Sequence, residues 1–163
     1  MFVYSVRSSS IKFFSVVILC LLILSAVITF SESDYIYAMS NGIEVNFSGI
    51  KSNEDRREFI KQFGLDPVEE FSEESIVLPT SLDRVLGEYN QLQKKQGLDL
   101  SKYLGKRVTR FTYKIDNYNH DGAVYVNILV HRDRIIACDV SSLEGEKFVL
   151  PLCDITKDSI KSK

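Results

Sequence analysis

Histidine and cysteine are scarce in this sequence, which contains two His and three Cys among 163 residues. Zinc sites need clustered His, Cys or carboxylate ligands. His120 and His131 lie in segments that we predict to be turns at the two ends of one strand, and they are therefore roughly 35 Å apart. They cannot share a metal ion within one hairpin. We predict solvated histidines, and we predict no metal, no cofactor and no set of catalytic residues.

The two cysteines in the second half of the chain lack the neighbours of a reactive thiol. A nucleophilic Cys needs a base within reach, and Asp139, which follows Cys138, should point to the opposite face of the same strand. Cys138 shares an apolar face with Ile136 and Val140, which favours a buried, structural residue. A disulfide with Cys153 is the alternative, because two Cys in an extracytoplasmic domain permit one bridge.

Basic charge is not in excess either. The chain has 20 basic and 22 acidic residues; without Arg7 and Lys12, residues 31–163 keep 18 basic and 22 acidic residues, a net charge of −4. Proteins that bind nucleic acids usually present a basic face, so we predict no nucleic-acid partner. The most acidic stretch consists of Glu69, Glu70, Glu73 and Glu74. For this stretch we favour a solvated loop, with a contact to a divalent cation or to a basic partner as the alternative.

One long stretch carries no charge at all. Residues 13–30 contain no charged residue, no Pro and no Gly, and a helix of this length spans roughly 27 Å, close to the hydrocarbon core of a bilayer. Arg7 and Lys12 precede it, and loops rich in Lys and Arg tend to stay cytoplasmic. We therefore predict a cytoplasmic N-terminus at 1–12, a transmembrane signal-anchor at 13–30, a linker at 31–40 and an extracytoplasmic remainder.

Two alternatives to a retained anchor stay open. Ser31-Glu32-Ser33 offers small residues in the spacing of a signal-peptide cleavage site, and cleavage there would release a secreted protein. The apolar run is longer than the corresponding part of most signal peptides, which favours retention. A buried core helix is the other alternative, although core helices usually keep a polar face.

Residues 41–152 have the pattern of one small α+β domain. Alternation of apolar and polar residues predicts strands at 43–47, 68–71, 75–78, 107–117, 123–130, 135–141 and 147–152. Helices are predicted at 54–63, after a capping box of Ser52 and Asp55, and from a cap at Thr80 to Gly97. We expect two amphipathic helices packed on one face of a mainly antiparallel sheet, followed by a flexible tail at 153–163.

The second helix has the clearest apolar stripe in the domain. Its members recur at helical spacing and are Leu82, Val85, Leu86, Tyr89 and Leu92. The predicted sheet face that bears Phe111, Tyr113 and Ile115 is the natural surface for this stripe to cover. We therefore expect Leu86, in the middle of the stripe, to be largely buried.

The loop at 98–106, after the second helix, is the one candidate for a functional surface. Asp99 and Tyr103 are the residues that could shape a pocket there, since loops often carry function. The favoured alternative is structural: Leu98, Leu100 and Tyr103 fold back and fill the core between helix and strand.

Part of this pattern resembles a known family. The similarity is carried by YNQLQKKQGLDLSKYLGK at 89–106, supported by REFIKQFG at 57–64, FTYK at 111–114 and Asn117-Tyr118. These segments resemble the bacterial family called domain of unknown function 4830. The resemblance implies an N-terminal membrane segment before one small domain, and it implies no catalytic residue because the family has no established activity. The chain departs from the family pattern at Leu65, where Trp is common, and at Ala137-Cys138, where two Gly are common.

These observations lead to one functional hypothesis and two rivals. We expect a non-enzymatic, membrane-tethered binding or interaction module outside the cytoplasm, whose partner is a protein, a peptide or another component of the cell envelope. The first rival is an envelope hydrolase with an unrecognised carboxylate site, which requires a concave pocket with convergent polar groups. The second is an accessory subunit of a membrane complex, which a large exposed apolar patch would favour.

Overall fold

The computed structural model describes residues 38–40 and 43–161, together with Ile18. The chain divides into two compact units, Met1–Asp34 and Tyr35–Lys163. Apart from Ile18, the N-terminus at 1–12 and the anchor at 13–30 lie outside the described residues, so the membrane topology stays a prediction. Among the residues that are described, none of the helices has the length and apolar character that crossing a bilayer requires.

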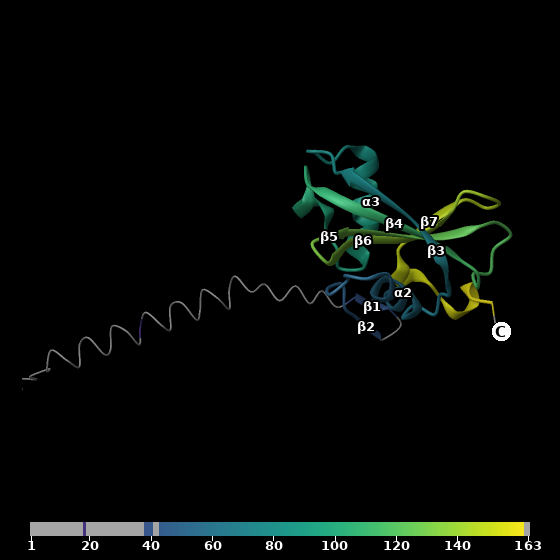
Figure 1. Ribbon diagram of the computed structural model, residues 1–163. Coiled ribbons are helices and arrows are strands. Elements are labelled where there is room, and N and C mark those ends of the chain that lie inside the picture. Colours follow the sequence, from purple (N-terminus) through teal and green to yellow (C-terminus); the bar gives the residue numbers. More distant parts are fainter. Residues whose placement is uncertain (1–17, 19–37, 41–42, 162–163) are drawn as a thin grey trace, which may run out of the picture. The chain divides into compact units, whose positions relative to one another are not determined.

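A five-stranded antiparallel sheet forms the centre of the domain (Figure 1). Its strands lie side by side in their order along the chain: β3 (Pro67–Val77), β4 (Arg107–Ile115), β5 (Val124–His131), β6 (Arg134–Ser142) and β7 (Phe148–Leu150). A two-stranded sheet pairs β1 (Ala38–Ser40) with β2 (Ile43–Val45). Two α-helices accompany these sheets in the described part of the domain. The predicted α+β class is therefore confirmed.

The two short strands predicted at 68–71 and 75–78 are one continuous strand, β3. Its residues Glu69–Ser75 are all exposed, so they lack the alternation by which a half-buried strand is recognised. A strand at the edge of a sheet has one neighbour and can keep both faces near solvent. The acidic stretch is thus a strand and not the loop that its composition suggests.

Helix α2 (Asn53–Lys61) covers one face of the sheet (Figure 1). It begins with the predicted capping box: Ser52 Oγ accepts a hydrogen bond from Asp55 N at 3.1 Å, and Asp55 Oδ2 accepts one from Ser52 N at 2.8 Å. Phe59 and Ile60 pack from this helix into the larger of two apolar clusters. The central strands contribute alternate residues to this cluster: Phe111, Tyr113, Val126, Ile128, Cys138 and Val140.

Helix α3 (Arg84–Lys95) covers the opposite face, so the prediction that both helices share one face and that this helix covers Phe111 and Tyr113 is wrong. Leu86 and Tyr89 pack against a second cluster, to which the central strands contribute the intervening residues Val108, Leu129 and Ala137. Residues 45–65 already cover the first face. The apolar part of the second face is consequently left for α3.

The buried side of α3 also differs from the predicted stripe. The helix begins after the N-cap residue Asp83, whose Oδ1 accepts a hydrogen bond from Leu86 N at 2.7 Å, and not after Thr80. Leu82 therefore precedes the helix, and Leu82 and Val85 are 40% and 69% exposed. The helix buries Leu86 and Tyr89 in part, and Asn90 and Gln93 fully.

Two glutamines at the end of α3 are buried because they complete the edge of β6. Gln93 Oε1 accepts a hydrogen bond from Cys138 N at 2.9 Å, and Gln96 Nε2 donates one to Cys138 O at 2.7 Å. Gln96 Oε1 also accepts one from Leu152 N at 3.1 Å. Buried backbone groups need partners, and β7 pairs with β6 only from Val140 to Ser142. The side-chain amides of Gln93 and Gln96 therefore bond the part of β6 that the short strand β7 does not reach.

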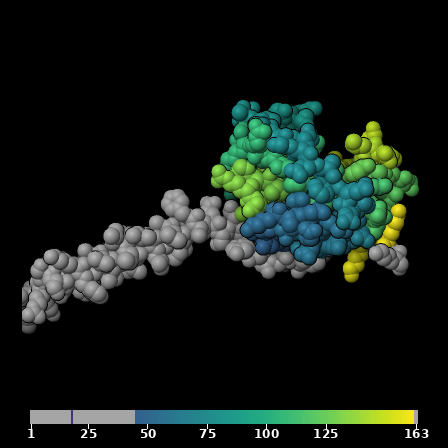
Figure 2. Space-filling view, in the orientation of Figure 1, coloured from purple at the N-terminus to yellow at the C-terminus, as the bar shows by residue number. Residues whose placement is uncertain are grey.

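The domain extends further at both ends than the sequence predicts. The last residues of the predicted linker at 31–40 form β1. Residues 153–161 pack against the domain instead of forming the expected flexible tail, and Figure 2 shows them in yellow beside it. Ile155 is buried, and Lys161 N donates a hydrogen bond to Asn117 O at 2.8 Å. Two isolated isoleucines, Ile155 and Ile160, in a polar segment are too weak a pattern to predict this attachment.

Candidate functional site

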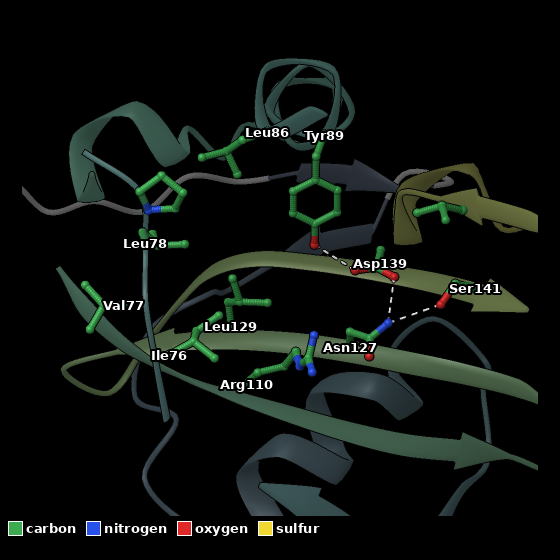
Figure 3. Close-up of a pocket in the computed structure, with 12 residues that line it drawn as sticks. Ile76, Val77, Leu78, Leu86, Tyr89, Arg110, Asn127, Leu129, Asp139 and Ser141 are labelled. Carbon is green, nitrogen blue, oxygen red and sulfur yellow. Dashed lines mark hydrogen bonds between the residues drawn. The ribbon is translucent and has the colours of Figure 1, made fainter. Parts of the chain in front are cut away.

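An open groove of about 430 Å³ lies between α3 and the sheet (Figure 3). The apolar residues that line it are Ile76, Val77, Leu78, Pro79, Leu86, Leu129 and Val149. The polar residues that line it are Tyr89, Arg110, Asn127, Asp139 and Ser141. The groove thus combines apolar walls with a few convergent polar groups, as ligand-binding pockets commonly do.

The register of the strands places the polar residues of the groove side by side. Asn127 of β5 lies opposite Thr112 of β4 and opposite Asp139 of β6. Arg110 and Leu129 form the pair two residues further along the same face. Because successive residues of a strand point to opposite faces, these side chains point toward α3, and their neighbours in sequence enter the core under α2.

Asp139 is the centre of a hydrogen-bond network at the base of the groove (Figure 3). The residue is 4% exposed. Its Oδ2 accepts a hydrogen bond from Tyr89 Oη at 2.7 Å, and its Oδ1 accepts one from Asn127 Nδ2 at 2.8 Å. Asn127 Oδ1 in turn accepts one from Thr112 Oγ1 at 2.9 Å, and Asn127 Nδ2 also donates to Ser141 Oγ at 3.1 Å. The network ties α3, through Tyr89, to the three central strands.

Burial governs the protonation of this network. It raises the pKa of the Asp139 carboxyl above its ordinary value, although hydrogen bonds from Tyr89 and Asn127 act in the opposite direction. Burial, together with the adjacent charge of Asp139, raises the pKa of Tyr89 well above its ordinary value. The phenol therefore keeps its proton and remains the donor to the carboxyl.

Arg110 supplies the one basic side chain among the residues that line the groove. Its guanidinium forms an ion pair with Glu74 of β3, and the two side chains are 47% and 57% exposed. Exposed ion pairs contribute little to stability. Arg110 can therefore exchange Glu74 for a polar group of a ligand at small energetic cost.

One carboxyl group lies among the described residues that line the groove. It belongs to Asp139, and both oxygens of this carboxyl already accept hydrogen bonds. Carboxylate-based glycosidases need two carboxyl groups that flank the scissile bond. The groove offers no such pair, whereas its apolar walls and single cation can hold an uncharged or amphipathic group.

The cysteines lie away from the groove. Cys138 is fully buried in the cluster under α2, which confirms the structural role predicted for it. Burial raises the pKa of the Cys138 thiol well above its ordinary value and that of Cys153 to about 11. Both residues are thiols in the structure, so the alternative of a Cys138–Cys153 disulfide is not realised in it.

The residues that the sequence suggested as a surface site, Asp99 and Tyr103, lie outside the groove. Asp99 caps a short 3₁₀ helix, η1 (Leu100–Tyr103), by accepting hydrogen bonds from Ser101 N and Asn90 Nδ2, each at 3.0 Å. Burial alone would raise the pKa of Asp99, but the hydrogen bonds from Asn90 and Ser101 lower it to about 2. Asp99 therefore attaches the loop to α3.

Tyr103 and its neighbours in this loop have packing roles. The ring of Tyr103 contacts the ring of His131 edge-on, with centroids 5.7 Å apart. Leu98 and Leu100 are buried, one in each apolar cluster. The loop thus fills the core between helix and strand, as the structural alternative predicted.

The two histidines each bond a backbone carbonyl. His120 Nε2 lies 2.8 Å from Glu144 O, and His131 Nδ1 lies 3.0 Å from Arg107 O. Both residues are partly buried, so they are less solvated than the sequence predicts.

A family model described as Domain of unknown function (DUF4830) matches residues 59–140. The chain belongs to this family. No curated protein and no solved structure gives a significant match to the chain. The span that the family model covers runs from α2 to β6 and includes Tyr89, Arg110, Asn127 and Asp139. Four of the five polar residues of the groove thus lie in the matched span, and Ser141 lies one residue beyond it.

Sequence reasoning missed these four residues. The sequence offers one signal. Asn127 and Asp139 are polar residues that alternate with the apolar residues of two strands, so each lies on the face opposite to the apolar one. Nothing local links them to Tyr89, which lies in a helix 50 residues before Asp139, since the pairing depends on which sheet face α3 covers.

Proposed function

We propose that this protein is a non-enzymatic binding module, tethered to the membrane by residues 13–30 with its domain outside the cytoplasm, and that its ligand occupies the groove between α3 and the sheet. The observation that carries the proposal is the combination of apolar walls with a fixed polar base around Asp139. A preformed base of this kind orients a ligand without reorganisation. The proposed ligand is a protein or peptide segment with apolar side chains.

The rival proposal of an envelope hydrolase has less support. Its catalytic carboxylate would be Asp139, whose oxygens both accept hydrogen bonds, and the described residues that line the groove include no second carboxyl. The accessory-subunit proposal draws on Leu82, just before α3, and Val85, in its first turn, which are both exposed. Scattered apolar residues are common on protein surfaces, so this second proposal rests on a weaker feature than the groove.

Site-specific photo-crosslinking in producing cells tests the proposal. A photoreactive residue at Val149, which lines the groove and is 44% exposed, should give a discrete adduct. The matched control is Leu143, which is 77% exposed and does not line the groove. The substitution Arg110→Gln should weaken the adduct at Val149, because it removes the one cation of the groove. Equal adducts at the two positions, or none at Val149, would contradict a ligand in the groove.

A further inference from the structure

The edge of β3 is left open in the described part of the domain. The strand has 11 residues and pairs with β4 alone, and its residues Glu69–Ser75 are all exposed (Figure 1). At the other side of the sheet, β7 has three residues and the amides of Gln93 and Gln96 occupy the edge of β6. On that side the fold thus combines a short strand with side-chain amides that bond β6, whereas β3 is long and the backbone groups that point away from β4 are available.

Most of this open edge is regular enough to pair with another strand. From Phe71, opposite Tyr113, to Val77, opposite Arg107, the pairs with β4 continue without a shift of register. Proline and irregular register are two devices that block pairing at an edge. Here both are confined to the start of the strand, between Pro67 and Phe71.

The side chains of this edge select the charge of a pairing segment. Within the described residues, Glu74 is the one glutamate of β3 that forms an ion pair, and Glu69, Glu70 and Glu73 have no ion-pair partner there. A second copy of β3 would bring glutamates opposite glutamates, and like charges across a strand pair are destabilising. The excess of acidic residues in the domain adds to this repulsion. A basic segment fits the edge and a second copy of the chain does not.

The register also indicates how the basic residues would be arranged. Glu73 lies opposite Phe111 on the α2 side of the sheet, and Glu74 lies opposite Arg110 on the groove side. An extended segment points successive side chains to opposite faces, so two adjacent basic residues would meet Glu73 and Glu74 together. Phe71 is 38% exposed and stacks on Tyr113 with ring centroids 5.4 Å apart, which adds a rigid apolar contact on the α2 side.

We propose that the edge Phe71–Ser75 binds a basic, extended segment of a partner protein, which adds to the sheet as a further strand. Backbone hydrogen bonds supply the affinity in this mode of recognition, and side chains supply the specificity. The residues of this edge do not line the groove, although Glu74 forms an ion pair with Arg110, which does. Either proposal can therefore fail while the other holds.

A direct test uses the full-length chain in non-ionic detergent and a short fluorescent peptide composed of Lys and Val. Fluorescence anisotropy should detect binding, and hydrogen exchange should show protection of those amides of Phe71–Ser75 that point away from β4. The same peptide with N-methylated backbone amides keeps its charges but cannot form the strand pairing. It should bind at least about tenfold more weakly.

Charge-reversal variants separate this edge from general attraction to an acidic protein. Glu73→Lys should weaken binding by about tenfold. The matched control Glu88→Lys makes the same charge change on the exposed side of α3, where the Glu88 side chain is 74% exposed, and should change affinity by no more than about twofold. Absence of binding, equal binding of the N-methylated peptide, or equal effects of the two variants would each overturn the proposal.

Discussion

Gln96 provides the sharpest test of how this sheet is completed. The substitution Gln96→Leu keeps the approximate volume of a side chain that is 1% exposed. It removes the donor to Cys138 O and the acceptor of Leu152 N, at 2.7 and 3.1 Å. Each buried backbone group left without a partner costs about 1–3 kcal/mol. The leucine side chain is more apolar than glutamine, and its burial offsets part of this cost. We therefore expect the free energy of unfolding to fall by about 2–4 kcal/mol. This is a large part of the ~5–15 kcal/mol that is typical of a domain.

Urea denaturation of residues 31–163, which contain both apolar clusters, measures this loss. We expect one cooperative transition with a lower midpoint for Gln96→Leu and an unchanged slope. Gln91→Leu is the matched control, because Gln91 is exposed on the same helix, and it should stay within about 0.5 kcal/mol. Hydrogen exchange at the Leu152 amide should accelerate in the Gln96 variant alone. If the two variants unfold at the same midpoint, the amides of α3 do not complete the edge of β6.

Two further predictions concern topology and pH. Protease added to intact spheroplasts should digest residues 31–163, because the basic N-terminal flank is expected to stay cytoplasmic; full protection would reverse the orientation. The pKa of Asp139 is higher in the folded protein than in the unfolded chain, where it is about 3.9. Protonated Asp139 therefore contributes stability below pH about 3.9, and this contribution is lost as pH rises through the folded-state pKa. Asp139→Asn should therefore gain stability relative to the parent protein, in urea midpoints, as pH rises from about 4. Asp99 has the opposite shift, so Asp99→Asn should be less stable than the parent above pH about 4 and should approach it as pH falls toward about 2. Parallel pH profiles of parent and variants would contradict both assignments.

The parts of the fold that were predictable from the sequence depend on local chemistry. The capping box of Ser52 and Asp55 involves residues three apart, and the structure has it as predicted. The antiparallel strands β4, β5 and β6 follow from short connections and alternating side chains, and their order in the sheet is their order in the chain. The apolar run at 13–30 is equally local, which is why a membrane anchor can be predicted from composition alone.

Other features depend on which surfaces meet in three dimensions. A stripe of apolar residues indicates that a helix packs on something, but not which face of the sheet it covers. Because residues 45–65 occupy one face, α3 packs on the other, where Leu86 and Tyr89 meet Leu129 and Asp139. The exposure of Val85 and the burial of Gln93 follow from the same placement. Hydrophobicity alone would have assigned these two residues the opposite environments.

The amino-acid sequence is sufficient to identify the fold class, the family and the net charge of the domain: it is acidic, with alternating strands and two amphipathic helices after an apolar segment. These properties are fixed by neighbours along the chain. The tertiary structure alone decided that the acidic stretch forms an open strand edge and that Tyr89, Asn127 and Asp139 meet at the base of one groove. The physical reason is that buried backbone and side-chain polar groups must find partners, and those partners lie on elements that are distant in sequence.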